Sequence, residues 1–178
     1  MSGEGSYTSE LEGGLDGSGL RIAIVRTRFH GDLTEMMTAA AVETLREHGV
    51  ADDDIAVHRV PGAWELPWAA RRLAGSGEID AVIAIGCVIR GDTAHFDFVA
   101  GEAARGLMDV GLTADVPVIL GLLTTETRDQ AEERADPARQ DKGREVALAA
   151  LEMGRFDRHG DTTPGDARAR PPRAPADA

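Results

Sequence analysis

Apolar residues follow two different patterns along the chain. Residues 20–25, 80–89 and 116–123 are short apolar runs, rich in β-branched residues and without polar faces, which predicts buried strands. Residues 55–60 alternate weakly between apolar and polar positions and predict a fourth strand. Elsewhere apolar residues recur every three or four positions, as on one face of a helix. Helices are therefore predicted at residues 32–48, 64–74, 95–110, 126–135 and 142–153.

This order of elements predicts the fold class. Strands without polar faces, separated by helices, indicate a parallel sheet covered on both faces. We expect a three-layer α/β/α sandwich with a four-stranded parallel sheet over residues 20–156. Residues 1–19 are polar and rich in Gly and Ser, which predicts an N-terminal arm, where residues 6–10 could add a short strand. Residues 157–178 hold four of the eight prolines, which predicts a disordered tail.

Charge and composition exclude several classes of protein. The formal charge of −12 at pH 7 disfavours duplex nucleic acid and anionic membranes as partners. No apolar run approaches the roughly 18 residues that cross a bilayer, and no signal-peptide pattern is visible, so we expect a cytoplasmic protein. The single cysteine, Cys87, excludes an internal disulfide and leaves no cysteine cluster for zinc. No P-loop or dinucleotide-binding glycine motif is present.

The residues that follow the predicted strands are the candidates for chemistry, because ligands of open parallel sheets bind beyond the carboxyl ends of the strands. They include aromatic rings, glycines, hydroxyls, two Glu and two His. This mixture suits a planar heterocycle and a phosphate better than it suits a metal. They are Arg26, Thr27, Arg28, Phe29 and His30, then Pro61, Gly62, Ala63, Trp64 and Glu65, then Arg90, Gly91, Asp92, Thr93, Ala94 and His95, and finally Thr124, Thr125 and Glu126.

The segment at residues 90–95 is the most informative of these. Gly91 lets the backbone approach a ligand, and Thr93 supplies a hydroxyl where the next helix is expected to begin, so that free N–H groups could bind an anion. His95 lies in the first turn, where a neutral imidazole could accept and return protons. On spacing alone, Thr93 could also be a simple helix cap and His95 an exposed helix residue.

Five other side chains have two interpretations each. Arg134 and Lys142, the only lysine, could bind phosphate or be solvated helix charges. Phe29 could stack on a ring or cap the core, and Glu65 could bind hydroxyls or favour the start of a helix. Cys87 lies within an apolar run, which favours a core role over a nucleophilic one.

Six segments along the chain form a characteristic series. They are V-P-G-A-W-E-L-P at 60–67, G-C-V-I-R-G-D-T-A-H-F-D at 86–97, L-T-T-E-T at 123–127, Q-A at 130–131, E-R-A at 133–135 and D-K-G at 141–143. In combination these segments resemble the lumazine synthase family, and the order and spacing hold from about residue 11 to residue 156. The segment at 86–97, with its R-G-x-T-x-H core, is highly specific.

The resemblance implies a flavodoxin-like fold and a cofactor-independent transferase of riboflavin biosynthesis. Such an enzyme condenses 5-amino-6-(D-ribitylamino)uracil with 3,4-dihydroxy-2-butanone 4-phosphate to give 6,7-dimethyl-8-ribityllumazine. It implies that His95 moves protons and that neither a cofactor nor a metal takes part. The pyrimidine and its ribityl chain would contact Phe29, Ala63, Trp64, Glu65, Val88, Ile89 and Leu120. The phosphate would be held by Asp92, Thr93 and Arg134, with Lys142 as a secondary polar contact.

The resemblance also implies an assembly. The family's site lies between subunits of a homopentamer, with the Leu120 and Arg134 regions supplied by the neighbour. Only seven residues separate Arg134 from Lys142, the short link that permits a sixty-subunit shell. Riboflavin synthase is a candidate protein partner.

Three residues depart from the family's usual pattern. His30 stands in place of Asn, Leu120 in place of a stacking Phe, and Trp64 in place of Phe. An aromatic contact contributes about 0.5–1.5 kcal/mol beyond area burial, so Leu120 should weaken pyrimidine binding. Two alternatives therefore stay open. One is a non-catalytic shell that binds flavin or lumazine. The other is a riboflavin synthase of archaeal type, which has no need of Thr93 and Arg134 as phosphate ligands.

Overall fold

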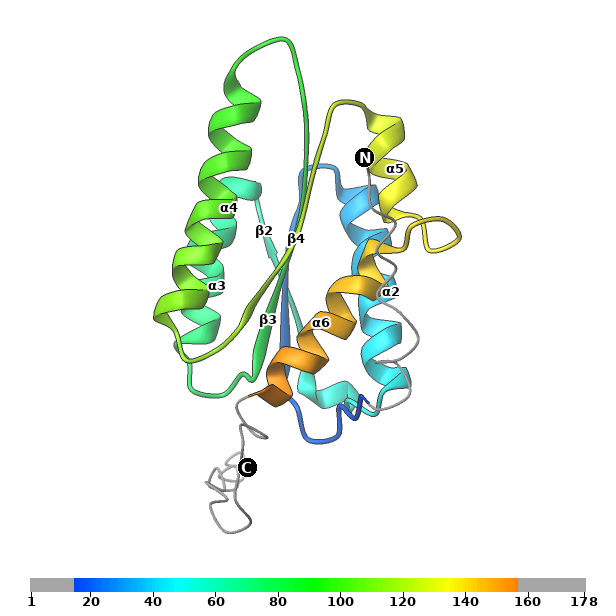
Figure 1. The fold of residues 1–178 in the computed structure, drawn as a ribbon, viewed down its shortest axis with the longest axis vertical. Coiled ribbons are helices and arrows are strands. Elements are labelled where there is room, and N and C mark those ends of the chain that lie inside the picture. The colour runs from blue at the N-terminus through cyan, green and yellow to red at the C-terminus, as the bar shows by residue number, and fades with distance from the viewer. Residues whose placement is uncertain (1–14, 157–178) are drawn as a thin grey trace.

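Four parallel strands form the central sheet, in the order β2-β1-β3-β4 (Figure 1). The computed structural model describes residues 15–156. Strand β1 pairs in parallel with both β2 and β3, and β3 pairs in parallel with β4. The predicted three-layer α/β fold with a four-stranded parallel sheet is confirmed. The strands are β1 (Ile22–Thr27), β2 (Ile55–Val60), β3 (Ala81–Ile89) and β4 (Val118–Thr125).

Helices cover both faces of this sheet (Figure 1). The buried residues form two clusters, one on each side of the sheet. The first packs α2 (Gly31–Glu47), α5 (Arg128–Ala135) and α6 (Lys142–Phe156) against one face. The second packs α3 (Leu66–Ala74) and α4 (His95–Thr113) against the other. Two short 3-10 turns, η1 (Asp52–Asp54) and η2 (Ala63–Glu65), flank β2.

Helices on each face approach one another closely at a glycine. A Cβ at Gly143 of α6 would overlap the Met37 carbonyl oxygen of α2. A Cβ at Gly106 of α4 would lie 2.8 Å from Cγ of Pro67 in α3. Both approaches are closer than real Cβ contacts, so the helix spacing on each face depends on the absence of a side chain at the glycine.

Two predicted strands end later than expected. Arg26 and Thr27 were predicted to follow β1, and Thr124 and Thr125 to follow β4, but all four belong to the strands. Arg26 is buried because its guanidinium donates to Thr34 and Glu35, and Thr27 is buried because its hydroxyl donates to the Phe29 carbonyl. Hydrogen bonding of this kind lets polar residues occupy interior strand positions.

The helix boundaries differ by smaller amounts. The helix expected to begin near Thr93 begins at His95 and extends to Thr113, and the last helix extends to Phe156. Helix α5 begins at Arg128, where the Thr127 hydroxyl caps the Gln130 N–H. The predicted strand at residues 6–10 and tail at 157–178, with most of the predicted arm, lie outside the described residues. No helix within residues 15–156 is long and apolar enough to cross a membrane.

Candidate active site

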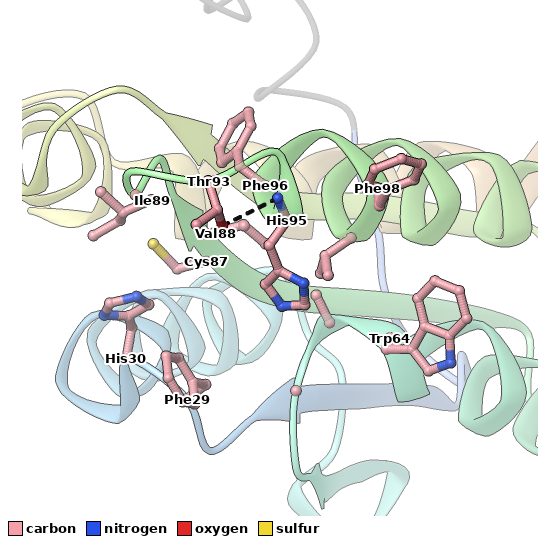
Figure 2. Close-up of a pocket in the computed structure, with 14 residues that line it drawn as sticks. Phe29, His30, Trp64, Cys87, Val88, Ile89, Thr93, His95, Phe96 and Phe98 are labelled. Atoms are coloured by element: carbon pink, nitrogen blue, oxygen red, sulfur yellow. Dashed lines mark hydrogen bonds between the residues drawn. The ribbon is translucent and has the colours of Figure 1, made fainter.

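A cavity of about 590 Å³ opens at the carboxyl ends of β1 and β3 (Figure 2). Its walls come from the turn after β1, the η2 turn after β2, the end of β3 and the first turns of α4. Most of the wall is apolar. The lining residues are Phe29, His30, Gly62, Ala63, Trp64, Cys87, Val88, Ile89, Gly91, Thr93, His95, Phe96, Phe98 and Val99.

The turn after β1 presents Phe29 at the mouth of this cavity. Phe29 is 69% exposed, so its ring face is available to a ligand. The backbone beneath it is fixed from two sides. The Phe29 N–H donates to the Pro61 carbonyl oxygen at 3.2 Å, and the Thr34 hydroxyl donates to the Thr27 carbonyl oxygen at 2.8 Å. An exposed ring on a rigid turn is suited to stacking on a planar ligand.

His30 follows in a left-handed backbone conformation, with φ 52° and ψ 46°, and is the N-cap residue that precedes α2. This conformation is uncommon for residues other than Gly, although Asn, Asp and His adopt it several times more often than most. Its ring meets the Phe29 ring edge to face. At the start of α2 the His30 carbonyl oxygen accepts the Leu33 and Thr34 N–H groups, each at 3.1 Å.

The η2 turn contributes a second wall. Ala63 is buried, whereas Trp64 is 60% exposed and borders the cavity. The Glu65 carboxylate does not line the cavity; its Oε2 accepts the Gly62 N–H at 2.9 Å. Glu65 thus holds the backbone that surrounds Ala63 and Trp64.

The loop between β3 and α4 provides hydrogen-bond donors. Within residues 15–156 the N–H groups of Gly91, Asp92, Thr93 and Ala94 donate to no other protein atom. The Thr93 hydroxyl accepts the His95 N–H at 3.4 Å and faces the cavity (Figure 2). Several unpaired N–H groups at the start of a 19-residue helix form a site suited to an anion.

His95, the first residue of α4, points into the cavity toward the turn that carries Phe29 and His30 (Figure 2). The His95 side chain is exposed, and neither of its two ring nitrogens is hydrogen-bonded to another described residue. An imidazole in this position could exchange protons with a ligand that stacks on Phe29.

Cys87 lies at the base of the cavity but belongs to the hydrophobic core. It is 3% exposed, and burial raises the pKa of its thiol to about 11. A thiol of this kind is almost entirely protonated at neutral pH and is a poor nucleophile. The core role predicted for Cys87 is confirmed.

Five of the residues predicted for the site do not line this cavity. Three of them lie on other elements. Leu120 is 53% exposed on the edge strand β4, Arg134 near the end of α5 donates to the Gln130 carbonyl oxygen at 2.9 Å, and Lys142 begins α6 beside Glu145. The full set is Glu65, Asp92, Leu120, Arg134 and Lys142.

Comparisons with known proteins identify the family. The 6,7-dimethyl-8-ribityllumazine synthase family matches residues 19–158. The chain belongs to this family. A relative of that name from Gemmatimonas aurantiaca is 53% identical over 151 residues, which cover 84% of this chain and 92% of the relative. These matches favour the synthase over the riboflavin synthase and the non-catalytic shell considered from sequence.

In this member of the lumazine synthase family, the cavity also contains residues that sequence reasoning missed. Phe96, Phe98 and Val99 line it from the first turns of α4. Phe98 and Val99 stand three and four positions after His95, the spacing that places helix residues on one face. This periodicity was the available signal for Phe98 and Val99, whereas Phe96 was marked only by its place in the matching segment at 86–97.

Proposed function

We propose that this chain condenses 5-amino-6-(D-ribitylamino)uracil with 3,4-dihydroxy-2-butanone 4-phosphate to give 6,7-dimethyl-8-ribityllumazine, phosphate and water. One observation carries the proposal: a single cavity in a lumazine synthase family chain combines the exposed Phe29 ring, His95 and the free N–H groups after Arg90. The Phe29 ring suits a planar substrate, His95 suits proton transfer, and the N–H groups suit a phosphate.

The pyrimidine would stack on Phe29. Its polar edge would pair with main-chain groups at Ala63 and Trp64 on one side and at Val88 and Ile89 on the other. All of these residues border the cavity. The Gly62 N–H donates to Oε2 of Glu65. The other carboxylate oxygen of Glu65, Oε1, would accept hydrogen bonds from ribityl hydroxyls.

The phosphate would bind at the loop before α4. The Asp92 N–H and the Thr93 hydroxyl would donate to its oxygens, and the positive end of the α4 dipole would favour its charge. This arrangement would place the butanone between the loop and the pyrimidine, within reach of His95.

The chemistry follows from this placement. The substrate's own 5-amino group attacks the ketone carbon, and water leaves as the imine forms. Phosphate then leaves as inorganic phosphate, and the ribityl-bearing nitrogen closes the ring with loss of a second water. His95 would take and return the protons that these steps exchange. Because the nucleophile belongs to the substrate, the protein mainly holds the two reactants in position.

A second subunit would complete the site. Among residues 15–156, no Lys or Arg lines the cavity. A bound phosphate dianion is stabilised most strongly by a cationic side chain. Arg134 of a neighbouring subunit would supply it, with Lys142 nearby, and Leu120 would cover the pyrimidine.

Exposed apolar side chains support such an assembly. Trp68, Phe98, Met108 and Leu112 are each more than 60% exposed on α3 and α4. Large exposed apolar groups that share one face of a protein indicate a protein interface. We propose a homopentamer, and sedimentation would separate it from a sixty-subunit shell. Riboflavin synthase stays a predicted partner.

The proposed roles can be separated by two variants. His95→Ala should lower kcat far more than it weakens phosphate binding, because it removes the proton carrier. Arg134→Ala should mainly raise the KM for the butanone phosphate. Steady-state kinetics with each substrate varied, together with titration of inorganic phosphate, measures both effects. Equal effects of the two changes on every parameter would contradict this division of roles.

A further inference from the structure

Arg90, the residue between β3 and the loop at residues 91–94, contacts two residues of α4 and one residue that follows β4. Its Nη1 and Nη2 donate to both carboxylate oxygens of Asp97 in α4, at 3.2 Å and 3.0 Å. Its Nε lies 2.8 Å from Oε2 of Glu126, which follows β4. Its guanidinium lies over the Phe96 ring, with Cζ 4.1 Å from the centroid.

These contacts join the two ends of the loop that precedes His95. Arg90 stands immediately before the loop and Asp97 two residues after His95, so the bidentate pair closes the segment as a bridge. The Arg90 N–H also donates to the Thr125 carbonyl oxygen at 2.9 Å. Within the loop, the Thr93 hydroxyl accepts the His95 N–H at 3.4 Å, and the Ala94 carbonyl oxygen accepts the Asp97 and Phe98 N–H groups at the start of α4. Among the described residues, the Arg90 side chain is the one that connects the start of this loop both to Asp97 of α4 and to Glu126 after β4.

Arg90 does not line the cavity. Three of its five guanidinium N–H groups, one on each nitrogen, already donate to carboxylates. The guanidinium holds the pKa of Asp97 below its usual range, which agrees with a pair that stays ionised. A bidentate Arg–carboxylate pair fixes geometry as well as charge.

We propose that Arg90 is a positioning residue, which holds the loop at 91–94 and His95 in the geometry that binds the phosphate of the butanone substrate. The proposal rests on the proposed function, since that function defines the anion. Arg90 acts through Asp97 and Glu126 and does not touch the substrate.

The direction in which Asp97→Asn changes the affinity for phosphate tests the positioning role of Arg90. Asp97 carries a negative charge close to the proposed phosphate site, and like charges repel. If Asp97 acted only through its charge, or if Arg90 bound phosphate directly, Asp97→Asn would tighten phosphate binding. If the Arg90–Asp97 pair positions the loop, the same variant weakens phosphate binding despite the removal of a negative charge.

The experiment titrates inorganic phosphate into the purified full-length chain by calorimetry and measures the KM for each substrate. For Asp97→Asn we expect the Kd for phosphate and the KM for the butanone phosphate to rise together by about five-fold, with the KM for the pyrimidine nearly unchanged. Arg90→Lys should behave similarly, because a point charge does not replace the bidentate pair. Asp109→Asn is the matched control, since Asp109 pairs with Arg105 at 3.0 Å on the same helix, and it should change none of these values.

Unchanged or tighter phosphate binding in Asp97→Asn would overturn the positioning role. If that variant fails to fold, Glu126→Gln gives the same comparison from the other side of Arg90. A wild-type chain that binds phosphate and yet forms no lumazine would overturn the proposed function, while the phosphate titrations would still decide the role of Arg90.

Discussion

The rings of Phe29 and His30 meet edge to face, with centroids 5.2 Å apart and an interplanar angle of 87°. Both rings line the cavity, and this contact leaves the Phe29 ring 69% exposed. His30 makes it from a left-handed backbone position, where the family usually has Asn. Asn and His both tolerate positive φ better than most residues. The exchange of Asn for His is therefore compatible with the same left-handed backbone, and it adds an aromatic ring.

Substitutions at position 30 should separate the backbone requirement from the ring contact. His30→Ala and His30→Gly both remove the ring, but only Ala is strained at φ 52°. The Gly variant should therefore be more stable than the Ala variant by about 1 kcal/mol. Urea denaturation of both variants measures the difference. An Ala variant as stable as the Gly variant would argue against a left-handed residue 30.

Gly106 and Gly101 of α4 should respond in opposite directions to Ala. A Cβ at Gly106 would lie 2.8 Å and 2.9 Å from two ring carbons of Pro67, whereas a Cβ at Gly101 meets nothing within 4 Å. Gly106→Ala should cost about 1–3 kcal/mol of stability through overpacking. Gly101→Ala should gain up to about 1 kcal/mol from helix propensity. Thermal denaturation compares the two, and equal melting temperatures would contradict the close packing of α3 on α4.

Cys87 should behave as a core residue. Cys87→Ser should leave kcat nearly unchanged and lower stability by about 1–3 kcal/mol, because it buries a hydroxyl among apolar groups. With a pKa of about 11, the thiol should react slowly with Ellman's reagent at pH 7 in the folded protein and rapidly after unfolding. Rapid labelling of the folded chain, or loss of turnover in a folded Ser variant, would assign Cys87 a chemical role.

The Asp32–Arg128 ion pair joins the first turn of α2 to the start of α5 and should make stability depend on pH. Its hydrogen bond to Arg128 holds the pKa of Asp32 below the ordinary 3.8. Since the folded pKa is the lower one, the stabilisation is present above pH 3.8 and is lost as the pH falls through the folded value. Asp32→Asn should therefore be less stable than the wild type at pH 7, with a difference that shrinks in acid. A difference that is constant with pH would contradict this pair.

Hydrophobic pattern was enough to predict the layers, because buried parallel strands are apolar on both faces. It failed at the ends of β1 and β4. Arg26 and Thr125 are polar in sequence yet buried in the strands. The Glu35 carboxylate reaches Arg26 only when α2 packs beside β1, and the Thr125 hydroxyl donates to the Thr127 carbonyl oxygen in the turn that follows β4. A hydrophobic pattern records neither partner.

The cavity was predictable in part for a geometric reason. Parallel strands place their carboxyl ends at one edge, so Phe29, Trp64 and His95 were expected to converge there, and all three line the cavity. Arg134 and Lys142 lie on α5 and α6 and do not. Spacing along one chain cannot predict which side chains a second subunit would add to a site.

Product formation from the two purified substrates tests the proposed function most directly. The reaction is followed by lumazine absorbance and fluorescence, with no cofactor added. We predict turnover well above the spontaneous reaction, and its loss in Arg134→Ala when the butanone phosphate is held near the KM of the wild type. Formation of lumazine at only the spontaneous rate by a folded, assembled protein would contradict the synthase and would instead favour a shell that binds flavins without catalysis.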